Sequence, residues 1–311
     1  MATSKTTGDG ESGRLLGGRG PQLAAAGVLA LLAFGAWQAM LSGNQRVAAD
    51  PRYRVTAESI AVSPPPSWVR GDVRSETLSQ FGPEATLSSL DPPERLEQPL
   101  ATAFARHAWV RSVVRITKSP PNKLRVELEY RTPLAAIGDA GRPGELLLAD
   151  AEAVRLPEAD LTAAELRHLP RITLPASAAA AGAPPLGQPW VDTRVRGAVA
   201  IAGALGPAWW DLQLADIRPV DPPRRGAGAS SPAYELLSQG GTRIVWGAAP
   251  MTVPSGEPSF PEKLARLTAY VNANGPLRGD RSPASIDLRS SRLLVEPRTA
   301  LNAGSDEPIT K

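Results

Sequence analysis

The sequence contains no cysteine, and it has only two histidines among its 311 residues. Without cysteine, the chain has no disulfide, no thiolate zinc site and no cysteine nucleophile. Phenylalanine, tryptophan and tyrosine together make up only 5% of the residues. The charges nearly balance, because 34 basic and 31 acidic residues give a formal net charge of +3. Arginine is dispersed along the chain, so we expect no nucleic-acid partner.

The sequence also lacks the motifs that usually carry catalysis or phosphate binding. It has no GxSxG elbow, no GxxxxGK[ST] loop and no HExxH pair. Both histidines, His107 and His168, lie near predicted helix ends, where the helix dipole and free carbonyls favour a cation, so we expect capping or surface roles. Asp287 is expected to pair with a neighbouring arginine at a strand end. We therefore predict a protein that is not an enzyme, with no cofactor, no metal and no small-molecule substrate.

Proline, in contrast, is abundant. Its 32 residues are about 10% of the chain, against a usual value of about 5%. Several lie in pairs or triplets, at 64–66, 120–121, 184–185 and 222–223. The chain length suggests two domains at about 150 residues each. We therefore expect ordered domains that are joined by rigid breaks.

One long hydrophobic run lies near the N-terminus, from Leu23 to Leu41. At about 1.5 Å per residue it would reach about 28 Å as a helix, close to the thickness of about 30 Å of a hydrocarbon core. We predict a transmembrane helix over 23–41, with Leu31 and Phe34 inside the span and Trp37 as an interfacial anchor. The alternative is a cleaved signal peptide, whose apolar region usually has about 7–15 residues. The flanking positive charges are nearly balanced and do not decide the orientation.

Residues 53–137 are predicted to form a β-α-α-β-β unit. In its last strand, Leu124, Val126, Leu128 and Tyr130 alternate with charged residues, a period of two that is typical of a strand with one buried face. The predicted strands of this unit cover 53–62, 109–117 and 123–136, and the predicted helices lie within 69–80 and 94–109.

Residues 138–298 are predicted to form a second, β-rich α+β domain. Its helices are expected at 162–168, with a Thr162 cap and Glu165 at the third position, and at 193–205 and 261–274. Its strands are expected at 146–149, 153–156, 211–219, 234–238, 242–246 and 285–289. We expect residues 1–22 to be a disordered tail, 42–52 a linker and 299–311 a flexible tail.

Three segments, in this order, resemble the FtsQ/DivIB family of bacterial cell-division proteins. HAWVRSVVRITKSPPNKLRVELEYRTPLA, at 107–135, is similar to a family segment that begins HPWV, with Ala108 in place of the proline. WGAAP followed by PEKLARL, at 246–250 and 261–267, resembles a glycine turn and helix of the family, and SIDLR, at 285–289, resembles a late strand. RSSRLLVEP replaces the glycine-containing turn that follows this strand in the family.

The resemblance implies a fold class and a topology. The fold would be α+β, with the N-terminal transmembrane helix followed by a POTRA-type β-α-α-β-β domain and a second β-rich α+β domain. The protein would be a single-pass protein of the cell inner (cytoplasmic) membrane, at the division septum, with its N-terminus in the cytoplasm and its bulk on the periplasmic side.

The resemblance also implies a function. The chain would be a non-enzymatic, membrane-anchored scaffold that links early and late division proteins during septum assembly. Its partners would be coiled-coil division proteins of the FtsB/DivIC and FtsL types. An alternative class is a POTRA-containing envelope transport or outer-membrane assembly or chaperone factor, and a third is a cleaved periplasmic binding protein.

The candidate partner-binding residues lie at and after the late strand, where a family partner adds a strand to the sheet edge. We place this edge at Ile286, Leu288, Arg289, Leu293 and Val295. Ile286 and Leu288 are alternatively ordinary core residues, and a core strand still exposes its backbone edge.

Overall fold

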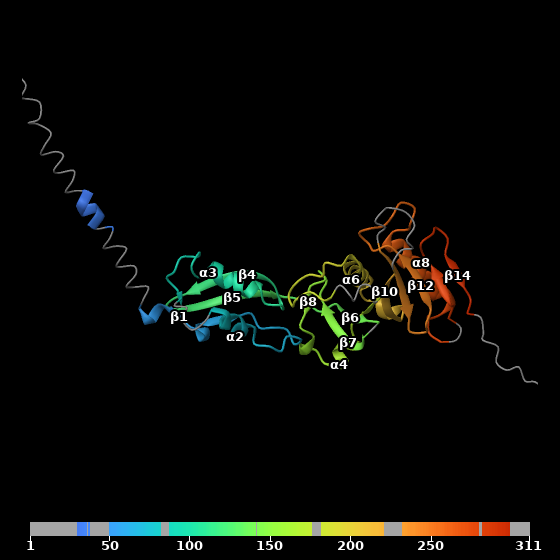
Figure 1. Ribbon diagram of the computed structural model, residues 1–311, viewed down its shortest axis with the longest axis horizontal. Helices are drawn as coiled ribbons and strands as arrows, with labels where there is room; N and C mark the ends of the chain where they lie inside the picture. The colour runs from blue at the N-terminus through green and yellow to red at the C-terminus, as the bar shows by residue number, and fades with distance from the viewer. Residues whose placement is uncertain are drawn as a thin grey trace, which may run out of the picture.

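The computed structural model contains two main sheets, which follow one another along the long axis of the molecule, and a third sheet of two short strands (Figure 1). The N-terminal sheet has three strands in the order β2-β5-β4, and the C-terminal sheet has nine, in the order β14-β13-β12-β11-β10-β9-β6-β7-β8. A short pair, β1 with β3, flanks the N-terminal sheet. The structure describes residues 30–35, 37, 50–81, 87–140, 142–175, 182–220, 232–279 and 282–298.

The N-terminal part follows the order strand, helix, helix, strand, strand over β2, α2, α3, β4 and β5. The alternation predicted for 123–130 is confirmed, because Leu124, Val126 and Leu128 are buried in one core with Leu100 and Phe104 of α3. The elements of this part are η1 (Pro51–Tyr53), β1 (Arg54–Val55), η2 (Ala57–Ser59), β2 (Ile60–Val62), α2 (Val73–Leu78), η3 (Ser79–Phe81), β3 (Leu87–Ser88), α3 (Glu97–Ala105), β4 (Val110–Ser119) and β5 (Lys123–Tyr130).

The C-terminal part is built around the nine-stranded sheet. Its elements are β6 (Ala135–Asp139), β7 (Arg142–Ala149), β8 (Arg155–Leu156), η4 (Glu158–Asp160), α4 (Ala163–Arg167), β9 (Arg171–Leu174), α6 (Thr193–Leu205), α7 (Ala208–Asp211), β10 (Leu214–Val220), β11 (Ala233–Ser238), β12 (Arg243–Gly247), α8 (Phe260–Asn274), β13 (Ser285–Asp287) and β14 (Leu294–Glu296). The helices predicted at 162–168, 193–205 and 261–274 are confirmed as α4, α6 and α8, and the predicted Thr162–Glu165 capping box is present.

The large sheet is mixed rather than antiparallel. Its pairs β6–β9, β9–β10 and β12–β13 are parallel, and its other neighbours are antiparallel. Parallel neighbours need a crossover connection, and α4, the pair α6 and α7, and α8 lie within these connections. The predicted fold class, α+β with a transmembrane helix, a POTRA-type domain and a β-rich second domain, is therefore wrong. The described fold is mixed α/β. The prediction failed because helical periodicity shows where a helix lies but not which strands it connects.

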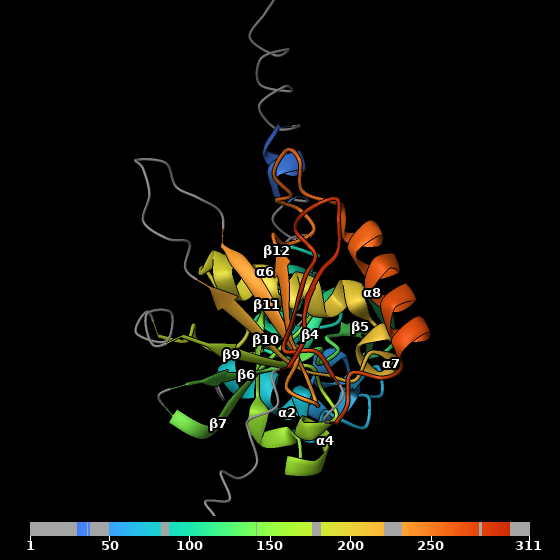
Figure 2. The same ribbon diagram turned by 90° about the vertical axis from the view of Figure 1, so that its right-hand side faces the viewer.

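Helices α6 and α8 pack against strands of the large sheet in one hydrophobic core, and Figure 2 shows α8 running beside the sheet. Tyr234 of β11 reaches α6, where its hydroxyl donates to the carbonyl of Thr193 over 3.2 Å. This approach requires glycine at position 197, because a Cβ atom there would lie 1.9 Å from the Tyr234 oxygen. Burial raises the pKa of Tyr234 far above its ordinary value, so the hydroxyl stays a neutral donor.

The predicted membrane anchor falls mostly outside the described residues. Of Leu23–Leu41, the structure describes only 30–35 and 37, all helical, with Leu31, Phe34 and Trp37 exposed; Leu23 and Leu41 lie outside the described residues. Across the part of the chain that the structure describes, no helix has both the length and the apolar character that a membrane span requires. The predicted localisation as a single-pass inner-membrane protein is therefore contradicted and is not carried forward.

Candidate partner-binding edge

Strand β14 ends the nine-stranded sheet, and among the described residues no strand pairs with its outer side. Two of its side chains are exposed apolar residues, Leu294 at 53% and Val295 at 38%. A strand edge with unpaired backbone groups is a template for another strand. Strand β14 therefore has both the backbone and the apolar side chains that strand addition uses.

The opposite end of the large sheet is closed. The amide of Arg155 in β8 donates to the carbonyl of Gln188 over 2.9 Å, and the amide of Gly187 donates to the carbonyl of Arg155 over 2.8 Å. A bridge between Val154 and Pro189 continues this cover. The outer edge of β8 is thus already paired by the chain itself.

Of the two outer strands of the small sheet, β2 and β4, the longer one, β4, is protected in another way. Its pairing with β5 is interrupted twice, between Val110 and Ser112 and between Val113 and Arg115. Bulges and charged side chains are two of the devices by which proteins protect sheet edges from unwanted pairing. Of the outer strands β4, β8 and β14, β14 is the one whose described residues carry neither a bulge nor a covering segment.

The predicted site residues divide between the core and the edge. Ile286 and Leu288 are fully buried, in line with the alternative that they are ordinary core residues, although Ile286 also belongs to β13, the strand next to the edge. Leu293 packs against the main core from the turn. Val295 lies opposite Ile286, so the two side chains share the core-facing side of the sheet, and its exposed part extends that core to the edge.

Arg289 closes the end of β13 by pairing with Asp287, as predicted for that carboxylate. Its Nη2 lies 2.6 Å from Oδ2 of Asp287, and its backbone amide donates to Oδ1 over 2.9 Å. Burial raises the pKa of Asp287, but the hydrogen bonds from Arg289 outweigh that effect and hold the pKa below its ordinary value. The bond to Asp287 likewise raises the pKa of Arg289. Arg289 is thus placed mainly by this local pair.

A buried ion pair lies behind this strand end. Lys263 of α8 is 0% exposed, and its ammonium group donates to the carboxylate of Glu257, which also accepts the amide of Ala248 over 2.8 Å. The ammonium lies 5.6 Å from the ring centre of Trp246. Position 247 is a glycine with a positive φ of 87°, and a Cβ there would meet both Glu257 and Arg289. The pair therefore fastens the loop between β12 and α8 close to Arg289.

Sequence reasoning missed Leu294 and the Lys263–Glu257 pair. Leu294 lies opposite Asp287, on the other side of the sheet from Val295. Its apolar character next to Leu293 and Val295 was a signal that this segment forms a strand rather than a turn. Lys263 gave no such signal, because a lysine in an amphipathic helix is ordinarily placed in solvent.

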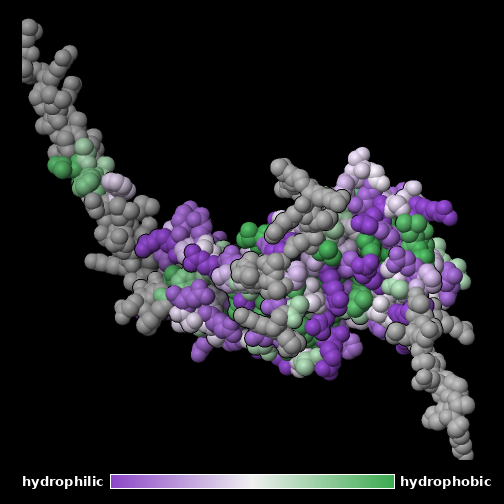
Figure 3. Space-filling view, turned by 45° about the vertical axis from the view of Figure 1, so that its right-hand side comes forward, coloured by the Kyte–Doolittle hydropathy of each residue, from purple (hydrophilic) through white to green (hydrophobic). Residues whose placement is uncertain are grey.

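Two ion pairs lie on the side of the large sheet that faces away from the main core. Arg243 lies 3.3 Å from Glu235 on the neighbouring strand, and Arg218 lies 2.8 Å from Asp216 on its own strand. The space-filling view shows a mainly hydrophilic surface in which apolar groups are scattered (Figure 3). Paired charges of both signs give this face no large single-sign field that would select a strongly charged ligand.

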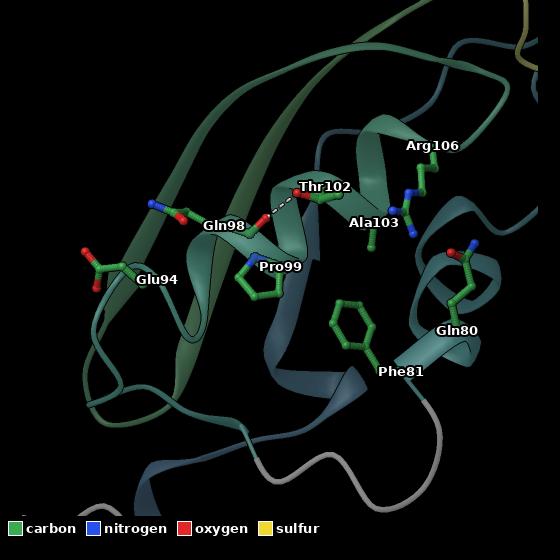
Figure 4. Close-up of a pocket in the computed structure, with 8 residues that line it drawn as sticks. All are labelled: Gln80, Phe81, Glu94, Gln98, Pro99, Thr102, Ala103 and Arg106. Atoms are coloured by element: carbon green, nitrogen blue, oxygen red, sulfur yellow. Dashed lines mark hydrogen bonds between the residues drawn. The ribbon is translucent and has the colours of Figure 1, made fainter.

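A cavity of about 440 Å³ lies on the N-terminal part, between η3 and α3. In Figure 4 the ring of Phe81 points toward Pro99 and Ala103, with Arg106 at one end of the cavity and Glu94 at the other. Gln80, Gln98 and Thr102 complete the lining, and the Thr102 hydroxyl donates to the Gln98 carbonyl over 2.8 Å. Its side chains include neither a nucleophile–base pair nor a set of metal ligands, so the cavity gives no catalytic assignment.

The two histidines have local partners. Nδ1 of His107 accepts the amide of Trp109 over 3.3 Å, and its Nε2 lies 3.0 Å from the carboxylate of Glu76. His168 is the C-cap of α4, the helix-end position expected from the sequence. Over the described residues, no three histidine or carboxylate side chains gather as a metal site would require.

Comparison with known proteins adds no assignment. No protein-family model matches this chain, and no curated protein has a significantly similar sequence. The functional argument therefore depends on the chain's own residues and geometry.

Proposed function

We propose that this protein is a non-enzymatic scaffold that binds a partner by strand addition to the outer edge of β14. The observation that carries the proposal is the unpaired outer side of β14 in the described structure, with exposed Leu294 and Val295. In strand addition, main-chain hydrogen bonds give affinity, and the alternating side chains give specificity.

The two side chains of β14 suggest how a partner strand would be recognised. Val295 extends the apolar core side, next to buried Ile286, and Leu294 lies on the water-facing side, next to Asp287. An incoming strand with an apolar residue toward Val295 would continue the core outward. On the other side, the incoming strand would lie next to Leu294 and Glu296 of β14.

The resemblance of the sequence to the FtsQ/DivIB family supports one class of partner. We propose that the protein links early and late components of the bacterial division machinery, and that the β14 edge takes a strand from a small coiled-coil protein of the FtsB/DivIC type. A protein of the FtsL type would join the same assembly through that coiled coil.

The test uses two proline variants, Leu294→Pro and Val295→Pro. Neighbouring residues of a strand direct their amides to opposite sides, so one of these prolines removes an outward amide and the other removes an inward one. The outward variant, Val295→Pro, should keep the stability of the wild type. It should lose partner binding by a factor of about 10 or more, because one hydrogen bond is lost and the proline ring clashes with the incoming strand. The inward variant should be destabilised.

Binding would be measured by calorimetry with the FtsB/DivIC-type protein of the same organism, and stability by urea unfolding. Arg196→Gln, at an exposed position of α6 and away from the edge, is the control variant and should bind like the wild type. If both proline variants stay folded and bind within about twofold of the wild type, the edge is not the binding site and the proposal is wrong.

A further inference from the structure

The two sheets meet at a junction where cations and the indole of Trp109 on one side face carboxylates on the other. The indole Nε1 of Trp109 donates to Oδ2 of Asp160 over 2.7 Å, and the amide of Arg70 donates to the same oxygen over 3.4 Å. Arg131, directly after β5, lies 2.5 Å from Asp150. We call the junction the set Arg70, Trp109, Arg131, Asp150 and Asp160.

The junction also has a shared apolar core. Leu148 of β7 and Leu156 of β8 are fully buried, and they belong to one cluster with Val69 and Val110 of the N-terminal part. Apolar contact of this kind is strong but not directional, so it holds two surfaces together without fixing their angle. The apolar core explains why the two parts associate and leaves their orientation to other groups.

The polar contacts of the junction are directional and largely removed from water. Trp109 is almost fully buried, so its indole N–H has to find an acceptor inside the protein, and Asp160 provides it. Asp150 is also buried, and it accepts the amides of Glu152 and Val154 in addition to the guanidinium of Arg131. A rotation of one sheet against the other would separate the Trp109 indole from Asp160 and the Arg131 guanidinium from Asp150, which would keep only the two amides of its own loop.

The geometry points to an orientation lock. We propose that the Trp109–Asp160 bond, with the Arg131–Asp150 pair, selects one angle between the two sheets and contributes little to their association. Buried polar groups that specify an arrangement without adding net stability are known from other proteins. The lock keeps the surface over α3 and the β14 edge at a fixed separation, and it does not depend on what binds at either place.

The test measures the angle and the stability separately. Because the chain contains no cysteine, the two substitutions Ala105→Cys on α3 and Ala269→Cys on α8 place one spin label on each part, both at exposed helix positions. Pulsed electron paramagnetic resonance then gives the distribution of label distances. In Asp160→Leu, which replaces the acceptor by an apolar side chain, the width of that distribution should about double. Because the indole N–H of Trp109 is then buried without an acceptor, the urea midpoint should fall as well. The double variant Trp109→Phe/Asp160→Leu removes both polar groups and should be equally broad, with a midpoint close to that of the wild type.

Two further variants make the result decisive. Asp160→Asn keeps an acceptor oxygen and should give the narrow distribution of the wild type. Arg111→Gln removes the exposed pairs with Glu129 and Glu152 and should also stay narrow, because such pairs are weak. Broadening in Arg111→Gln as large as in Asp160→Leu would overturn the assignment to Asp160.

An unchanged narrow distribution in Asp160→Leu would show that the apolar core alone fixes the angle, and the proposal would fail. If Asp160→Leu does not fold, Trp109→Phe takes its place, since it removes the indole N–H and keeps an aromatic ring in the core. Broadening in Trp109→Phe supports the lock, and an unchanged width overturns it.

Discussion

Replacing Lys263 by methionine should destabilise the protein strongly, because it leaves a carboxylate without its cation in a poorly hydrated place. Lys263 is fully buried, and Glu257 has only 13% of its side chain exposed. Removing one partner of a buried ion pair typically costs about 3–5 kcal/mol. Glu257 keeps the amide of Ala248 and some water, so we expect a loss of about 3 kcal/mol in the free energy of unfolding, at the lower end of that range.

The assay is urea unfolding, followed by tryptophan fluorescence, in a double-mutant cycle of Lys263→Met and Glu257→Gln. Glu257→Gln should cost at least as much as Lys263→Met, because it leaves the more deeply buried charge unpaired. The double variant should be more stable than the sum of the two losses predicts, by about 1–3 kcal/mol, because no lone charge remains.

The matched control is Arg243→Met, which breaks an exposed pair with Glu235 and should cost less than about 1 kcal/mol. If Lys263→Met is equally mild, the ammonium is not desolvated, and the reasoning about this pair is refuted.

Three further predictions concern stability. Gly197→Ala should lower the free energy of unfolding by several kcal/mol in urea, because its Cβ would clash with the Tyr234 ring. Tyr234→Phe should not rescue it, since the ring carbon that carries the hydroxyl is also only 2.6 Å from that Cβ. Full rescue by Tyr234→Phe would contradict the clash. Thr162→Ala should cost about 0.5–2 kcal/mol through loss of the α4 cap, with Thr162→Ser close to the wild type, and equal losses in both would rule out the cap. Hydrogen bonds lower the pKa of several carboxylates, and in the buried cases they outweigh desolvation, which acts in the opposite direction. When the pKa of a carboxylate is lower in the folded state, its stabilisation is complete at a pH above its pKa in the unfolded state. That stabilisation is lost as the pH falls through its pKa in the folded state. The urea midpoint should therefore be flat from about pH 8 to 5 and fall below about pH 4. A midpoint that is unchanged at pH 3 would contradict this assignment. The carboxylates concerned are Asp50, Asp72, Glu165, Asp192, Glu262 and Asp287.

Elements with a strong local signal were predictable from the sequence. Helix α8 was expected over 261–274 and spans Phe260–Asn274, where Ser259 and Glu262 form a capping box and Gly275 follows the end. The alternation in β5 located its buried face correctly. In these segments the periodicity of apolar residues agrees with the residues that mark the ends of the element. Local sequence was therefore enough to predict the secondary structure without knowledge of tertiary contacts.

Elements that depend on distant contacts were not predictable. The expected single strand over 53–62 is two short strands, because the η2 turn at Ala57–Ser59 interrupts it. The expected strand start at Asp211 is the end of α7, where Trp209 is buried and Trp210 is exposed. Neither the parallel pairing of β12 with β13 nor the burial of Lys263 has a local signal, because both need partners that lie elsewhere in the chain.

In the candidate site, the sequence located the segment but did not show which of its residues are buried in the core and which form the exposed edge. SIDLR was expected at the edge, yet its apolar residues are core, and the exposed edge is β14, directly after the turn. A run such as LLV does not reveal which of its residues faces water, because that depends on the register with β13, and register is a property of two strands.

From β9 to β14, the strands of the large sheet lie side by side in the order in which they occur along the chain. During synthesis, each new strand therefore finds its neighbour already present, and the sheet grows in one direction. The outermost strand is the last of these to leave the ribosome, so a nascent chain that stops short of it presents a different edge. A partner that binds β14 would therefore bind only chains in which the large sheet has been made through β14.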